Sequence, residues 1–310
     1  PIDYDWIVVT LADGRAVNLV FKGVPLALAN TDNENLKLVA GSANIIVDGN
    51  VDLDPNGELT IDPAADSTFN GSISVKNLTQ SAGTGITTLN DSVTTYGSGG
   101  VSLTGENVAL NGPITTSNGG PVSTDLAGAL TIAAAGDITS DGAVTLDADG
   151  GISTAGDITT TGDAISFNDA TTLTGDLSLD TGTGAGTIAF NSTLDGAQDL
   201  TLTAGTGDLD FDGVVGGSTA LGAVTINEAA DVTIDDGVLG ITQDQMTEVV
   251  DGSLELMAPG ATADLYYETT ADDEGYRNVA ETTGVPSDAE GDEIPDAERP
   301  TDDDDASVDV

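Results

Sequence analysis

The five residues Ala135-Gly136-Asp137-Ile138-Thr139 recur letter for letter, further along the chain, as Ala155-Gly156-Asp157-Ile158-Thr159. Variants follow at residues 174–179 and 206–211, where Gly-Asp again precedes an aliphatic residue. A repeat of about 20 residues that holds two or three short strands has the size of one coil of a β-helix. Repetition of a turn and a strand is expected where like coils stack, so these residues predict a β-solenoid.

The chain between residues 41 and 250 is built of similar short segments. They alternate apolar and polar side chains and are bounded by Gly, Asn or Asp, which predicts short strands joined by tight turns. Examples are residues 43–47, 58–61, 71–75 and 101–104. An antiparallel sandwich stays open as an alternative, because its strands have the same period and similar spacing. The predicted fold class is all-β, with a parallel β-helix as its body.

Residues 1–40 differ from this body. Residues 6–11 and 16–21 are apolar runs separated by the dipeptide Asp13-Gly14, which is a frequent hairpin turn. We therefore expect residues 1–40 to form a β-hairpin that serves as a cap or a docking element.

Residues 251–310 also differ. Residues 251–270 predict two terminal strands, at 253–257 and 264–268, that cover the open end of the solenoid. Residues 271–310 contain 15 acidic residues, a composition typical of disordered tails. We expect this acidic tail to be ordered only when it binds a partner or cations.

The charge of the chain is extreme, with 53 acidic residues against 6 basic ones and a formal net charge of −47. Nucleic acid is excluded as a partner, because binding a phosphate backbone requires clustered Lys and Arg. No membrane insertion is expected either, since no apolar run approaches the ~18 residues of a membrane span. Self-repulsion of this size needs screening by salt or bound cations, which indicates a saline or calcium-containing setting.

The residue types that most enzymes need are scarce. The chain has no His and no Cys, which excludes Ser-His-Asp triads, Cys nucleophiles and thiolate metal sites. No basic residue lies between Lys76 and Arg277, so a lyase acting on acidic sugars lacks its cation and its base. Hydrolysis by paired carboxylates stays formally open. In a chain with 53 acids such pairs arise by chance, and we predict a protein that is not an enzyme and requires no cofactor.

Calcium is the predicted ligand, at one short segment. Asp52, Asp54, Asn56 and Glu58 place oxygen donors at alternating positions, as in the first half of a calcium loop. The twelfth position, which a full loop fills with a bidentate acid, is proline. Residues 54–57 also fit a simple tight turn between strands.

The aspartates of the Gly-Asp repeats, Asp137, Asp157, Asp176 and Asp208, allow two interpretations. Stacked in a row, they would form an edge of carboxylates that attracts cations. Asp residues in turns more often accept hydrogen bonds from nearby backbone N–H groups. We expect this capping role, with cation binding as a secondary effect.

The repeats at residues 181–191, 194–202 and 220–226 resemble those of the filamentous haemagglutinin-like and autotransporter-passenger β-helices of secreted bacterial surface proteins. The resemblance covers roughly residues 120–240. It implies a right-handed parallel β-helix, export, and a role in adhesion or surface architecture.

These features favour a structural subunit of an extracellular bacterial filament or surface assembly. We expect the terminal elements to bind other copies of the chain through Tyr4, Trp6, Val8, Tyr266 and Tyr267. One alternative is an adhesin or carbohydrate-binding β-helix whose partner is a surface polysaccharide. The other is a β-helix enzyme that acts on polysaccharides.

Overall fold

A computed structural model describes residues 35–53 and 55–234 with their side chains. Six further strands are described by their backbone alone, at residues 6–10, 19–21, 26–27, 246–248, 277–283 and 301–307. The chain divides into two units, Pro1–Asp251 and Gly252–Val310, and each is considered by itself.

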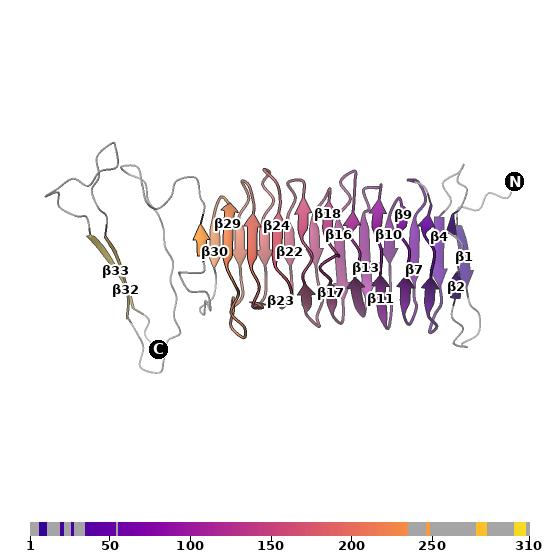
Figure 1. Ribbon diagram of the computed structural model, residues 1–310, viewed down its shortest axis with the longest axis horizontal. Coiled ribbons are helices and arrows are strands. Elements are labelled where there is room, and N and C mark those ends of the chain that lie inside the picture. Colours follow the sequence, from indigo (N-terminus) through magenta and orange to yellow (C-terminus); the bar gives the residue numbers. More distant parts are fainter. Residues whose placement is uncertain are drawn as a thin grey trace. The chain divides into compact units, whose positions relative to one another are not determined.

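The first unit is a parallel β-solenoid (Figure 1). Its chain winds through three parallel sheets, named here sheets A, B and C, and each turn of the winding is called a coil. In the described residues about nine coils contribute a strand to all three sheets, and two further coils add strands to sheets A and C.

The strands of the three sheets are as follows. Sheet A contains β1 (Trp6–Thr10), β4 (Asn35–Val39), β7 (Leu59–Asp62), β10 (Leu78–Gln80), β13 (Val101–Gly105), β16 (Val122–Leu126), β19 (Val144–Leu146), β22 (Ile165–Phe167), β25 (Ile188–Phe190), β28 (Leu209–Phe211) and β30 (Val232–Ile234). Sheet B contains β2 (Leu19–Phe21), β5 (Ile45–Val47), β8 (Ser67–Phe69), β11 (Ile86–Leu89), β14 (Asn107–Leu110), β17 (Leu130–Ile132), β20 (Ile152–Thr154), β23 (Thr171–Leu173) and β26 (Leu194–Asp195). Sheet C contains β3 (Leu26–Ala27), β6 (Val51–Asp52), β9 (Ile73–Val75), β12 (Val93–Thr95), β15 (Ile114–Thr115), β18 (Ile138–Ser140), β21 (Ile158–Thr160), β24 (Leu177–Asp180), β27 (Leu200–Thr203), β29 (Val224–Glu228) and β31 (Met246–Glu248).

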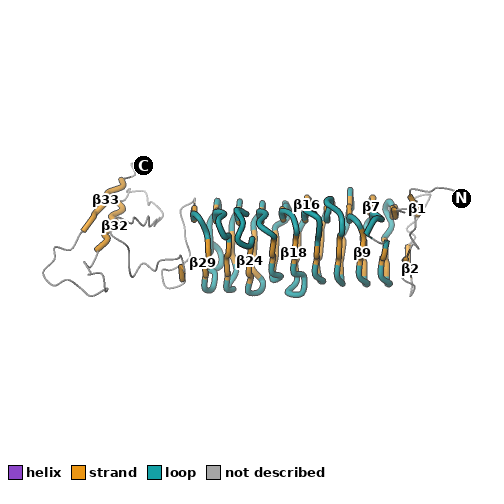
Figure 2. The backbone as a smooth tube through the Cα atoms, turned by 90° about the horizontal axis from the view of Figure 1, so that it is seen from above, coloured by secondary structure: helices purple, strands orange, loops and turns teal. Residues whose placement is uncertain are grey.

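The predicted strands and their parallel pairing are confirmed, and the antiparallel sandwich is excluded for this unit. Every strand pairing described in it is parallel, and Ile138 of one repeat lies directly beside Ile158 of the next. Coil length follows from the register of sheet A, in which Leu36, Leu59, Leu78 and Val101 stand side by side. The coil from Leu59 to Leu78 is therefore shorter than the coils before and after it. Loops at the corners absorb the differences (Figure 2).

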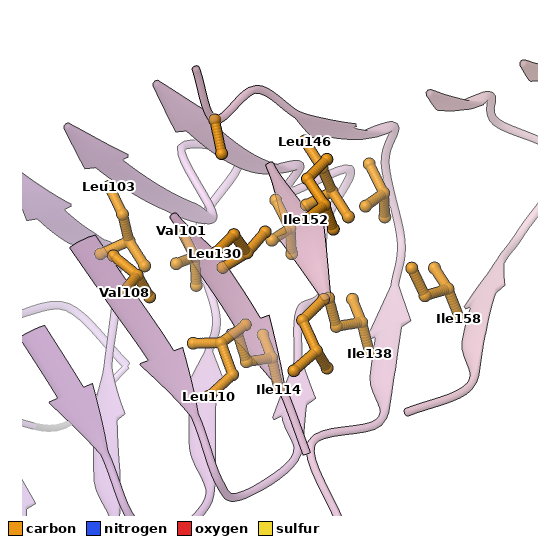
Figure 3. Close-up of a cluster of buried hydrophobic side chains, with 14 of the residues drawn as sticks. Val101, Leu103, Val108, Leu110, Ile114, Leu130, Ile138, Leu146, Ile152 and Ile158 are labelled. Atoms are coloured by element: carbon orange, nitrogen blue, oxygen red, sulfur yellow. The ribbon is translucent and has the colours of Figure 1, made fainter. Parts of the chain in front are cut away.

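One narrow core runs through the solenoid. Strand residues alternate between the two faces of their sheet, so every second side chain points inward. In the middle coils these are aliphatic residues with 0–1% exposure, such as Leu103, Leu110, Ile138 and Ile152, which pack from different sheets against one another (Figure 3). Each coil buries too little apolar surface to stand alone, so the stack supplies the stability.

The strands described within residues 1–40 do not form the predicted hairpin. β1 pairs in parallel with β4, β2 with β5 and β3 with β6, so each joins a different sheet. The Asp13-Gly14 dipeptide suggested a tight reversal, but apolar runs of this kind suit a solenoid coil equally well. The pairing does not test the docking role predicted for these residues.

Among the described residues of the second unit, β32 (Arg277–Thr283) pairs with β33 (Thr301–Ser307) in antiparallel fashion. β33 includes the acidic run from Asp302 to Asp305, so part of the acidic tail pairs with another segment of the same tail. The terminal strands predicted at 253–257 and 264–268 lie outside the described residues.

Candidate functional site

The segment predicted to bind calcium forms the connection between β6 and β7. Asp52 ends β6 with an exposed side chain, Asn56 is exposed in the turn, and Glu58 is partly buried before β7. Asp54 lies outside the described residues. Gly57 N–H donates to the Leu53 carbonyl at 3.2 Å, which closes the tight turn expected as the alternative.

Glu58 already has two donors from the next coil. Its Oε1 accepts hydrogen bonds from Lys76 Nζ at 3.0 Å and from Asn77 Nδ2 at 3.1 Å. Within the described ranges no group of three or more acidic side chains lies close enough together to hold a metal ion. The calcium prediction stays untested, and any cation at this turn would compete with Lys76 for the Glu58 carboxylate.

A second ion pair joins Lys37 of β4 to Asp62 of β7. The hydrogen bond from Lys37 holds the pKa of the Asp62 carboxyl below its ordinary value, and Ser81 Oγ donates to the same carboxylate at 3.0 Å. Both members of this pair are about one-third exposed, so the pair contributes little to stability. It joins one coil to the next.

The Gly-Asp aspartates accept backbone hydrogen bonds, and the donors come from the following coil. Asp137 Oδ1 accepts from Asp157 N–H at 2.9 Å, and Asp157 Oδ1 accepts from Ser178 N–H at 2.8 Å. Asp176 Oδ1 accepts from Asp199 N–H at 3.1 Å. The three aspartates accept backbone N–H groups as predicted, but the donors belong to the next coil and not to the turn that each aspartate occupies. Because each bond spans 20–23 residues, the carboxylates also link successive coils.

Side-chain amides make two further rows of bonds between coils. In the sheet B ladder, which starts at Asp48, the Nδ2 groups of Asn70, Asn90 and Asn111 each donate to the preceding member at 2.8 Å. In the sheet A ladder, Asn168 donates to Asp147 at 3.3 Å and Asn191 donates to Asn168 at 2.8 Å. Each amide follows the last inward residue of its strand, so it stands on the outer face. The rows satisfy donors and acceptors at the same time, and they bond each coil to the next.

A column of buried hydroxyl groups lies at the corner that follows sheet C. It comprises Thr95, Thr116, Ser140, Thr160 and Thr181, all 5% exposed or less. Thr116 Oγ1 and Ser140 Oγ are 3.2 Å apart, and Ser140 donates to the Gly120 carbonyl at 3.1 Å. Thr95 Oγ1 is the one buried side-chain oxygen of the described residues that has no hydrogen-bond partner. The column ties the corner loops to the core.

The outer face of sheet C carries an aligned row of hydroxyl side chains. Ser74, Thr94, Thr115, Thr139 and Thr159 stand side by side on five successive strands. The short distance between neighbouring strands, ~4.8 Å, places these hydroxyls in a regular array. They are partly or fully exposed.

Asp141 connects three coils near the same corner. Its Oδ2 accepts from Gly119 N–H at 2.8 Å, and its Oδ1 accepts from Thr161 Oγ1 at 3.1 Å. The hydrogen bond from the Gly119 backbone is the main reason why the pKa of the Asp141 carboxyl is lowered.

All five residues predicted to mediate self-association fall outside the described side chains. Trp6 and Val8 lie in β1, where the backbone alone is described, and Tyr4, Tyr266 and Tyr267 lie outside the described residues. Sequence reasoning missed the amide ladders and the hydroxyl column. The signal was present as Asn at the end of consecutive strands, but only the register shows which of these residues meet.

The fold defines a parallel β-solenoid protein. No protein-family model, curated protein or solved structure matches this chain. In the described part of the chain no helix has the length and apolar character needed to cross a membrane.

Proposed function

We propose that this chain is a non-enzymatic structural subunit of an extracellular bacterial filament or cell-surface assembly, and that it associates with other copies through its terminal elements. The observation that carries the proposal is how the described polar side chains are used. Aspartates, amides and hydroxyls from most coils bond the next coil rather than converge on a common point. A side chain that stiffens a rod is poorly placed to bind and turn over a substrate.

The ion pairs support the same proposal. Lys37 and Lys76 are the two basic side chains within the described ranges of the solenoid, and both pair with a carboxylate of a neighbouring coil. The chain has no His and no Cys. Without His or Cys, and with both described lysines paired, acid–base catalysis in the described solenoid would fall mainly to carboxylates. A catalytic carboxylate needs a partner group or a shaped cleft.

The proposal includes the finer features that the resemblance implies. We take the solenoid to be right-handed and related to the filamentous haemagglutinin-like and autotransporter-passenger β-helices. Right-handed crossover is also the rule for parallel strands joined by a connection. Calcium bound near Glu58 or along the aspartate row, and the salt of an extracellular medium, would screen the net charge of −47.

The test is to image the purified full-length chain and measure its mass by light scattering, with calcium and salt present. We expect filaments or ordered oligomers whose population rises with protein concentration. A chain that stays monomeric over the whole accessible range of concentration would contradict the proposal.

A further inference from the structure

The outer face of sheet B carries an uncharged patch on three successive strands, β8, β11 and β14. Thr68 lies beside Thr88 in the register, and the amides of the sheet B ladder follow two residues after these positions. None of the outward residues of the three strands is charged. The patch is called here the amide patch, and it comprises Thr68, Asn70, Ile86, Thr88, Asn90 and Asn111.

The sheet A ladder differs from this patch in charge. Its two amides, Asn168 and Asn191, stand between Asp147 in the coil before and Asp212 in the coil after. The sheet B ladder starts at a carboxylate too, but three amides then follow in succession. An amide donates as well as accepts hydrogen bonds, whereas an ionised carboxylate only accepts them. Sheet B is therefore the face that can bind a neutral polar ligand through both kinds of bond.

Each ladder amide has hydrogen-bonding capacity left. A side-chain amide has two N–H donors and a carbonyl oxygen with two lone pairs. Asn90 uses one donor on Asn70 Oδ1 and one lone pair for Asn111 Nδ2, both at 2.8 Å. Its second N–H and second lone pair have no partner among the described residues, and the side chain is exposed. Because the ladder already holds the amides in place, little conformational entropy is lost when a ligand binds them.

The patch also has an aliphatic component. Ile86 is 42% exposed and is one of the two large apolar side chains of the described residues that face solvent. It lies two residues before Thr88 on the same strand, so both side chains stand on the outer face. The patch thus sets an apolar contact beside a row of fixed donors and acceptors.

This chemistry favours one class of ligand. The patch offers no cation, and the net charge of −47 repels nucleic acids and acidic polysaccharides. A protein partner would require a wider apolar centre than Ile86 supplies. A neutral polysaccharide has hydroxyl groups that donate and accept, and it has C–H faces that pack on aliphatic side chains. The strand spacing of ~4.8 Å is close to the length of one sugar residue in an extended chain, so such a polymer meets a like group at each coil.

We propose that the amide patch binds a neutral polysaccharide, which lies along the solenoid axis across β8, β11 and β14. The polymer bonds the free donors and acceptors of Asn70, Asn90 and Asn111 and packs on Ile86. The proposal goes beyond the structural role proposed above and does not depend on self-association. A row of groups that does not converge on a point suits an extended polymer that is held and not turned over.

The test measures how much of the full-length protein is depleted from solution by chitin particles and by cellulose particles. Cross-linked polygalacturonate is the charged control polymer. We expect the wild type to bind at least one of the two neutral polymers and to leave the polygalacturonate in solution conditions of the same salt and calcium content.

Three variants locate the binding face. Asn90→Ala removes the central amide with its two ladder bonds, and we expect apparent affinity to fall by about tenfold. Ile86→Ser removes the apolar contact and should weaken binding several-fold. Asn168→Ala is the matched control, because it also removes an amide with two ladder bonds, but on sheet A. It should bind like the wild type. Circular dichroism and thermal unfolding establish that each variant is folded.

Each contrary outcome overturns the proposal. A wild type that binds neither chitin nor cellulose has no such site. Binding that Asn90→Ala leaves unchanged takes place elsewhere on the molecule, and equal losses for Asn90→Ala and Asn168→Ala show that binding depends on the integrity of the rod and not on this face. Equal binding to polygalacturonate shows that bridging cations are responsible. None of these results bears on self-association, which light scattering tests separately.

Discussion

Two columns of side chains run along sheet A, one residue apart, on opposite faces of the same strands. On the inner face the rings of Phe167, Phe190 and Phe211 stack with centroids 4.8 and 5.4 Å apart and interplanar angles of 10° and 7°. On the outer face the next residues, Asn168 and Asn191, are joined amide to amide at 2.8 Å. Both columns link the same coils, but the forces differ.

The inner column gains free energy from removing apolar surface from water, which is large and has little directional preference. The outer column gains it from directional hydrogen bonds that compete with water, so the net gain per bond is small. The inner face therefore accepts Leu146 in the coil before Phe167, whereas the outer ladder requires a suitable donor or acceptor in every coil. The core supplies most of the stability, and the outer rows add bonds that form only when the coils stand in this register.

The largest effect is expected from truncating the middle ring of the inner column. Phe190→Ala removes a fully buried ring that stacks on both neighbours, and we expect a loss of about 3–5 kcal/mol in the free energy of unfolding, measured by denaturant titration. Phe211→Ala is the control, since Phe211 has one ring neighbour and is slightly exposed. A smaller loss is expected for it. Equal losses would show that stacking on two sides adds nothing.

The second test asks whether an apolar group can replace a buried polar one in the hydroxyl column. Thr116 Oγ1 accepts from Asp141 N–H at 3.0 Å, so Thr116→Val leaves that N–H without its acceptor and should cost about 1–3 kcal/mol. Thr95→Val removes a hydroxyl that has no partner, so we expect no loss or a small gain. Thermal unfolding of both variants measures the two changes in stability. A large loss for Thr95→Val would indicate a buried water bound to its hydroxyl.

The third test inverts one link of the outer row. Asn168→Asp replaces a donor by a carboxylate that faces Asp147, and we expect a loss of about 1 kcal/mol at neutral pH that shrinks in acid. Thr131→Asp adds the same charge opposite Ala109 and Ser153, with no facing carboxylate, and should change stability less. Denaturant titrations at two pH values compare them. Similar losses for both variants would mean that added charge alone is responsible.

The smallest effect concerns Asp141. Its lowered pKa means that the folded state favours the carboxylate, so this stabilisation is complete above the pKa of the unfolded chain and is lost as pH falls through the folded pKa. The difference in Tm between the wild type and Asp141→Asn should therefore be constant above about pH 5 and diminish below it. Asp149→Asn, at an exposed position, is the control. A difference that grows in acid would contradict the assignment.

Much of the body could be predicted from the sequence, because alternating aliphatic residues bounded by Gly, Asn and Asp have few other uses. The sheet that a given strand joins could not be predicted. Asp137 and Asp157 precede neighbouring strands of sheet C, but the similar Gly207-Asp208-Leu209 leads into sheet A. Gly-Asp before an aliphatic residue marks the start of a strand and carries no information about which sheet it enters.

The structure of the ends and of the candidate site was harder to predict from the sequence, for physical reasons. The Asp13-Gly14 dipeptide favours a reversal locally, but the parallel pairing of β1 depends on β4, which follows β2 and β3 in the sequence. Backbone N–H groups were predicted as the donors to the Gly-Asp carboxylates, but the N–H groups that donate lie a full coil along the chain. Contacts of this range follow from coil length, which changes from one coil to the next along sheet A.

The hydrogen bonds that join coil to coil also give the solenoid a mechanical character. In the part of the solenoid that the structure describes, each strand pairs only with strands of the adjacent coils, so a pull on the ends of the stack would detach coils one after another rather than rupture the whole at once. Every coil released would lengthen the chain by roughly 70 Å, since an extended residue spans ~3.5 Å. A rod of this design would extend in steps under load and shorten again as each coil returned to its template.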